Sequence, residues 1–145
     1  MPLAQDKVLH ELNTACHSGD ANAVESAVTH AYEMGLKREY VPALLALLTQ
    51  RTHTRHEDIV SSLQMLRDPR AVDALYDTAL VNHEYLAYDK LFGLARKCTW
   101  ALADIGTPEA RARLVILARN SNSQIAAYAQ KRLDSWDDER QRKQT

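Results

Sequence analysis

A segment that occurs twice restricts the possible folds of this chain more than any other feature. Residues 66–75 read LRDPRAVDAL and residues 105–114 read IGTPEARARL, 39 residues later. The residues that match at this offset are apolar, or are the proline after the turn: Leu63 with Leu102, Leu66 with Ile105, Pro69 with Pro108, Leu75 with Leu114, and Ala79 with Ala118. A repeat that keeps core and turn positions and varies the polar ones indicates a packing unit rather than a catalytic motif.

Helical spacing of the apolar residues continues along almost the whole chain, and no strand-like alternation interrupts it. Glycine and proline number four each, so residues that break helices are scarce. The pattern predicts an all-α fold of about eight helices, at roughly 3–18, 20–35, 39–49, 56–66, 69–82, 91–105, 108–118 and 123–136, the first one including Leu3. Four helices begin after a residue that suits an N-cap: Asp20, Asp68, Thr107, and Asn122 or Ser123.

The length of 145 residues suits a single domain with a substantial core. We assign residues 1–136 to this domain. Residues 137–145 are charged and lack apolar anchors, so we expect a flexible C-terminal tail there.

The arrangement of a helix, a tight Asp-Pro or Gly-Thr-Pro turn and a second helix, repeated after about 40 residues, resembles HEAT repeats. RDPRAVDAL and GTPEARARL are most similar to the short HEAT-like repeats of bacterial proteins, the PBS-lyase type that bilin lyases also contain. The resemblance covers roughly residues 57–133. It implies a short right-handed α-solenoid whose second helices line a concave face. A fainter copy, GDANAVESAV at 19–28, would add Asn22, Glu25 and Thr29 to that face.

Charge and cysteine content indicate the environment of the chain. The net charge of −1 lacks the basic excess that phosphate backbones attract, so nucleic acid is an unlikely partner. There is no pattern typical of a signal peptide, and the nearly apolar run 41–48 is too short to span a bilayer. Cys16 and Cys98 share no motif and fit free thiols in a reducing compartment. We therefore predict a cytoplasmic protein without membrane contact.

Metal chemistry is the first enzymatic alternative. His53, His56 and Glu57, in the sequence HTRHE, are weak candidates for metal ligands, although the spacing matches neither zinc-protease motif. The segment 55–75 is also similar to a repeat of the deoxyhypusine hydroxylases, HEAT-repeat enzymes that bind two irons with four His-Glu pairs. The position 39 residues after the pair at 56–57 holds Ala95 and Arg96, so a second pair is missing in register. We predict no metal, no cofactor and no catalytic residue.

DNA reading is the second alternative, because the alkylpurine glycosylases contain similar repeats with aromatic and acidic residues on the concave face. Trp100, Tyr76 and Asp73 would fit such a role. The densest basic region, at 111–132, shares its helices with core positions, so no basic stripe accompanies them.

The polar residues that the repeat does not keep are the remaining candidates. Arg70, Asp73 and Asp77 lie at i, i+3 and i+7, and Glu109 and Arg113 occupy nearby positions in the next copy. They form either an acid-leaning binding strip or an ordinary solvated face. Tyr85 and Tyr88 lie in residues 84–93, which interrupt the repeat, and are either interface anchors or packing residues under the insertion.

These observations favour a non-catalytic protein-binding module over an enzyme. Its most concrete form is a bacterial immunity or inhibitor protein that covers a partner toxin or enzyme with its concave face. The alternatives are a HEAT-repeat enzyme or ligand binder, similar to the hydroxylases or the bilin lyases, and a DNA-binding HEAT protein.

Overall fold

A computed structural model describes residues 4–144, and this range is all-helical with no strand, as the periodicity predicted. It contains nine α-helices, α1 (Ala4–Ser18), α2 (Ala21–Met34), α3 (Val41–Leu48), α4 (His56–Leu66), α5 (Val72–Leu80), α6 (Gly93–Ile105), α7 (Pro108–Leu117), α8 (Ser123–Asp134) and α9 (Trp136–Gln144). Three short 3-10 turns, Arg38–Tyr40, Pro69–Ala71 and Glu84–Leu86, precede α3, α5 and α6. Leu3, which we placed in the first helix, lies outside the described residues.

Side-chain caps start the helices at the positions that the sequence indicated. The carboxylate of Asp20 accepts the N–H of Asn22, and the Asp68 carboxylate accepts the N–H of Arg70. At the next two starts, the Thr107 hydroxyl accepts the N–H of Ala110, and the Asn122 side chain accepts two backbone N–H groups. Each cap satisfies donors that the first turn of a helix leaves free, so these boundaries are encoded locally.

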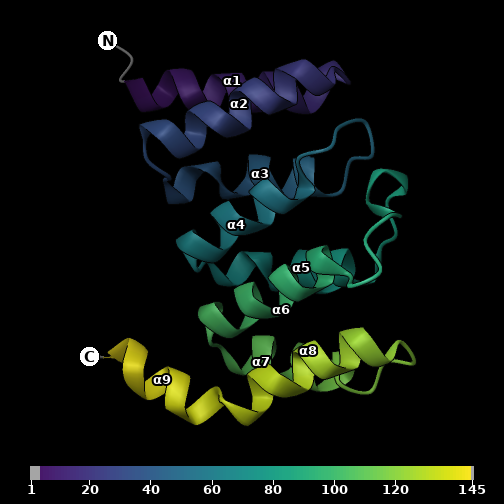
Figure 1. Cartoon of the computed structure of the whole chain (residues 1–145). Helices are drawn as coiled ribbons and strands as arrows, with labels where there is room; N and C mark the ends of the chain where they lie inside the picture. Colours follow the sequence, from purple (N-terminus) through teal and green to yellow (C-terminus); the bar gives the residue numbers. More distant parts are fainter. Residues whose placement is uncertain (1–3, 145) are drawn as a thin grey trace.

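The first eight helices form a stack of hairpins in two layers (Figure 1). One layer contains α1, α3, α5 and α7, and the other contains α2, α4, α6 and α8. The core lies between the layers, and the paired positions of the repeat are in it: Leu63, Leu102, Leu75 and Leu114 are all fully buried. The repeated segment is therefore a packing unit, as its apolar matches indicated.

The faint third copy of the repeat was misplaced. It aligned α2 with α5, but α2 packs against α1 and α4 and lies in the layer opposite α5. Glu25 of α2 forms an ion pair with Arg55 at the start of α4. Asn22, Glu25 and Thr29 therefore do not extend the face that carries Asp73.

Helix α9 raises the number of helices in residues 4–144 to nine, where we expected about eight. This helix consists of residues for which we expected a flexible tail. The expectation arose because the segment has no apolar face. Polar contacts hold it instead: Glu139 is buried and pairs with the buried Arg132, and Arg140 donates to the carbonyl of Ala103 in α6. Arg140 also lies over the ring of Trp136.

No helix within residues 4–144 has both the length and the apolar character that crossing a membrane requires. The right-handed course of the stack and the assignment of residues 1–136 to one domain stay predictions.

Candidate partner-binding surface

Helices α5 and α7 lie side by side in one layer and bring together several of the residues that the repeat does not keep. The Arg113 guanidinium lies 3.0 Å from the Asp73 carboxylate and 4.6 Å from the centre of the Tyr76 ring. The Asp73 side chain is still 79% exposed, so one carboxylate oxygen remains available to a partner. Arg113 thus links α5 and α7 at the surface, and the Asp73 carboxylate stays accessible to solvent.

Apolar side chains flank this ion pair. Leu80 at the end of α5 is 40% exposed, and Ile116 on α7 is 47% exposed. We use the name α5–α7 face for the exposed or half-buried residues of this region, namely Asp73, Tyr76, Asp77, Leu80, Glu109, Arg113 and Ile116. Asp77 and Glu109 are exposed carboxylates on the same two helices.

Arg70 is bound at the turn before α5 rather than to Asp73 or Asp77, the residues with which we grouped it. Its guanidinium donates to the buried Asp68 carboxylate at 2.8 Å and to the carbonyl of Arg38 at 3.1 Å. The hydrogen bonds from Arg70, together with the charge of Arg38, lower the pKa of Asp68 to about 2. Arg70 therefore fastens the turn between α4 and α5, and the ion pair of the α5–α7 face does not include it.

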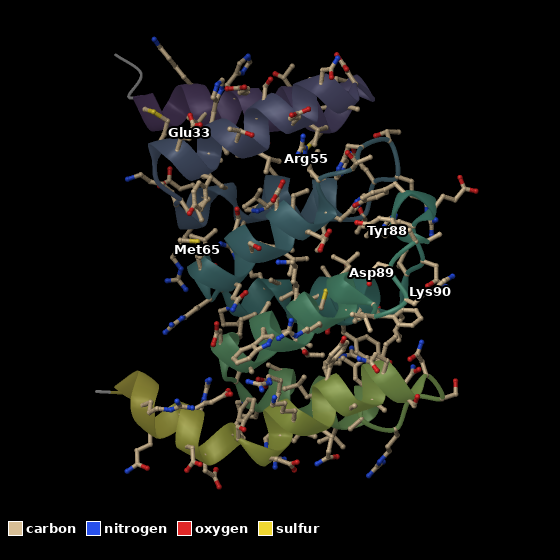
Figure 2. The ribbon with its side chains drawn as sticks, in the orientation of Figure 1. Glu33, Arg55, Met65, Tyr88, Asp89 and Lys90 are labelled. Atoms are coloured by element: carbon tan, nitrogen blue, oxygen red, sulfur yellow. The ribbon has the colours of Figure 1, made fainter. Side chains whose placement is uncertain are left out.

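The two tyrosines of the inserted segment, Tyr85 and Tyr88, differ in their exposure to solvent. Tyr85 is half-buried and donates its hydroxyl proton to Nδ1 of His56 at 2.7 Å, and burial raises its pKa. Tyr88 is 79% exposed and points outward beside Asp89 and Lys90 (Figure 2). Of the two alternatives for this segment, Tyr85 matches internal packing and Tyr88 matches a surface anchor.

The two histidines that we considered as metal ligands, His53 and His56, lie side by side, but their nitrogen lone pairs already accept hydrogen bonds. The rings of His53 and His56 stack with centres 4.3 Å apart. Nδ1 of His53 accepts the N–H of Arg55, and Nδ1 of His56 accepts the Tyr85 hydroxyl, while each Nε2 donates to a backbone carbonyl. A neutral imidazole has one lone pair, and in both rings this lone pair already accepts a hydrogen bond.

Glu57 lies close to the start of α6, and its charge adds to the effect of burial in raising the pKa of Tyr85. Its carboxylate lies 3.8 Å from the point where a Cβ at Gly93 would stand, close to the N-terminus of α6. The Asp89 carboxylate accepts the N–H of Gly93 at 2.9 Å in the same place. Both carboxylates lie at the positive end of the α6 dipole and stabilise it. This contact gives Glu57 a structural role without a metal.

Sequence reasoning missed His83 as a neighbour of these rings. Its ring stacks on that of His56 with centres 3.9 Å apart. His56 begins α4 and His83 lies in the loop before α6, and their spacing matches no motif. The only signal in the sequence was that a glutamate follows each of these two histidines, which does not reveal their contact.

Three basic residues of the densest basic region have internal contacts. Arg132 is buried between the Trp100 ring, 3.5 Å away, and the Glu139 carboxylate. Arg111 lies over Trp136, and Arg113 lies over Tyr76. Arg132 and Arg113 thus each cover one face of Trp100 and Tyr76, the aromatic rings that a DNA-reading role would use to stack bases.

Comparison with known families identifies one segment. Residues 94–120 match the model of the PBS lyase HEAT-like repeat, and they cover nearly all of α6 and α7 together with the turn between them. No curated protein and no solved structure matches the chain. The second copy of the 39-residue repeat is thus a HEAT-like repeat, within an all-helical protein.

Proposed function

We propose that this chain is a non-catalytic binding module that recognises another protein through the α5–α7 face. The observation that carries the proposal is the combination on this face of exposed Leu80 and Ile116 with a mainly acidic set of charges. Interfaces of this kind have apolar and aromatic anchors surrounded by polar groups. HEAT-like repeats are a common scaffold for such surfaces.

The charges suggest the chemistry of the partner. Asp73, Asp77 and Glu109 are opposed on this face by Arg113, whose guanidinium is already paired with Asp73. A partner surface with basic residues around an apolar patch is therefore complementary. Complementary charge accelerates association and selects against acidic partners.

The specific form of this function that we favour is an immunity or inhibitor protein. Such a protein acts by covering the active site of a toxin or enzyme and needs no reactive group of its own. An enzyme that acts on nucleic acid would present basic residues around its active site, which match an acidic cover.

The experiment compares capture by the chain and by a charge-reversed variant. Asp73→Arg combined with Asp77→Arg should reduce capture of the partner from native cells at least tenfold and leave the helical content unchanged. The matched control is Glu33→Arg combined with Glu39→Arg, because both residues are exposed and neither belongs to the α5–α7 face. The control makes the same change in net charge and should leave capture intact.

Two results would count against the proposal. Capture that survives the first variant would show that the α5–α7 face is not the interface. An equal loss in both variants would indicate a nonspecific charge effect. If a partner is captured, an activity assay of that partner with and without the chain then tests the inhibitor role.

A further inference from the structure

Four aromatic rings join two loops at one edge of the stack. His53 lies in the loop at residues 49–55 and His56 begins α4, while His83 and Tyr85 lie in the loop at residues 81–92. The two loops meet at the right-hand edge of Figure 1. The His56 ring lies between those of His53 and His83, with centre distances of 4.3 and 3.9 Å, and its centre is 5.7 Å from that of Tyr85. We name these four residues the histidine clasp.

Hydrogen bonds fix the protonation of the central ring. Nε2 of His56 donates to the carbonyl of Gln50 at 2.6 Å, so Nδ1 is the acceptor of the Tyr85 hydroxyl at 2.7 Å. The pattern requires a neutral imidazole with its proton on Nε2. The same reasoning fixes His53, whose Nε2 donates to Leu47 and whose Nδ1 accepts from Arg55.

We propose that the histidine clasp is an acid-sensitive switch, which holds the 81–92 loop against α4 when His56 and His83 are neutral and releases the loop when they are protonated. The proposal is independent of the identity of any partner. Its basis is the stacking of three imidazoles from two loops and the start of α4, since a second positive charge at this distance repels the first.

The direction of the pH effect follows from the surroundings of the rings. Burial, assisted by the nearby charges of His53, His83 and Arg51, lowers the pKa of His56 from 6.5 to about 4. Burial and Arg51 also lower the pKa of His83. A depressed histidine pKa means that the closed form prefers the neutral ring. The closed form therefore has its full stability above about pH 6.5 and loses it as the pH falls from 6.5 towards 4.

The charged groups around the clasp do not offset this effect. Arg51 and Arg55 contribute positive charge from the 49–55 loop. Asp58 lies 3.4 Å from Arg55, which also pairs with Glu25. The charges of Glu57 and Asp58 act on Tyr85, whose pKa they help burial to raise. Glu84, beside His83, is exposed and therefore well screened by solvent.

Release of the loop would change the surface at this edge. A cavity of about 330 Å³ lies behind the loop, lined largely by apolar side chains that include Val81, Leu86, Phe92 and Leu94. This pocket is already partly open to solvent, and movement of the loop changes its shape and displaces the exposed Tyr88.

Hydrogen exchange of the full chain, followed by mass spectrometry between pH 7 and pH 5, tests the switch. The readout is the protection of the amides in residues 81–92, corrected for the intrinsic pH dependence of exchange. Several of these amides donate to loop carbonyls, among them Leu86 to His83 and Asp89 to Leu86. With the pKa of His56 near 4 in the closed form, protection should fall roughly 20-fold or more between these pH values. The amides of α7 should keep their protection.

Variants separate the switch from general acid sensitivity. His83→Phe keeps a flat ring on His56 but cannot take a proton, so the fall in protection should be smaller than in the unaltered chain. Adding His56→Gln, which keeps a donor for Gln50, should abolish the fall. His17→Gln on α1, an exposed position, is the control and should behave as the unaltered chain.

Three outcomes would overturn the proposal. They are unchanged protection of the loop down to pH 5, an undiminished fall in His83→Phe, and simultaneous loss of protection in α7 and the loop. Should the double variant fail to fold, the single His83→Phe comparison still decides the matter.

Discussion

The turn between α4 and α5 and the turn between α6 and α7 have the same backbone conformation but different side chains. Each has a residue with positive φ at the helix end, Arg67 at 53° in the first turn and Gly106 at 73° in the second. Each then has a capping residue, Asp68 or Thr107, followed by proline. The repeat therefore conserves a backbone conformation, which several residue types can provide.

The side chains differ because each turn packs against a different neighbour. Asp68 is buried and binds the guanidinium of Arg70, and it lies near that of Arg38. Gly106 instead lies under the Arg140 guanidinium of α9, which would overlap a Cβ at this position. The first turn is stabilised by ion pairs within the stack, whereas the second is adapted to the helix that covers the end of the stack.

Core substitutions should have the largest effect and should affect both copies alike. Leu63 and Leu102 occupy equivalent positions and are both fully buried. We expect Leu63→Ala and Leu102→Ala each to lower the free energy of unfolding by about 3 kcal/mol, through lost apolar contacts and a residual cavity. Urea denaturation measures both. A difference of more than about 2 kcal/mol between them would argue against equivalent roles.

Substitutions at the positive-φ residues should separate the two turns. Gly106→Ala introduces a Cβ at φ 73° and displaces Arg140 from the Ala103 carbonyl, so we expect a loss of about 2 kcal/mol. Arg67→Ala exchanges one L-residue for another at φ 53° and should change stability by less than about 0.5 kcal/mol. Thermal unfolding of both variants checks this contrast, and equal losses would refute it.

Removal of the caps should have a smaller effect than the core substitutions and should depend on pH in one turn only. Thr107→Ala should cost about 1 kcal/mol, and Asp68→Ala somewhat more because Asp68 also binds Arg70. The pKa of Asp68 is lowered to about 2, so its contribution is present above about pH 4 and is lost as the pH falls towards 2. The cost of Asp68→Ala should therefore shrink at pH 2, whereas that of Thr107→Ala should not. Chemical denaturation at pH 6 and pH 2 provides the comparison.

Much of the fold was predictable because its signals are local. Each helix cap joins residues that are two or three positions apart in the sequence, so the capping residue can be recognised from its neighbours; this holds for Asp20, Asp68, Thr107 and Asn122. Helix α9 was not predictable in this way. It depends on Glu139 reaching Arg132 and on Arg140 reaching α6, and a helix without an apolar stripe gives no periodic signal.

The candidate surface was predictable only in part. The pattern identified Asp73 and Arg113 separately, and their ion pair follows from the packing of α5 against α7. It also grouped Arg70 with them, because spacing along a helix does not reveal that Asp68 binds this guanidinium. The contact of His56 with His83 depends on two loops that meet only in the folded chain.

The central claim is that binding resides in the residues of the α5–α7 face that the repeat does not conserve. Carboxylate footprinting of the chain, alone and with its captured partner, tests this claim most directly. We predict that the partner protects Asp77 and Glu109 from modification, while the exposed Glu33 and Glu39 react equally in both states. Protection of Glu33 and Glu39 with continued reactivity of Asp77 and Glu109 would contradict the claim.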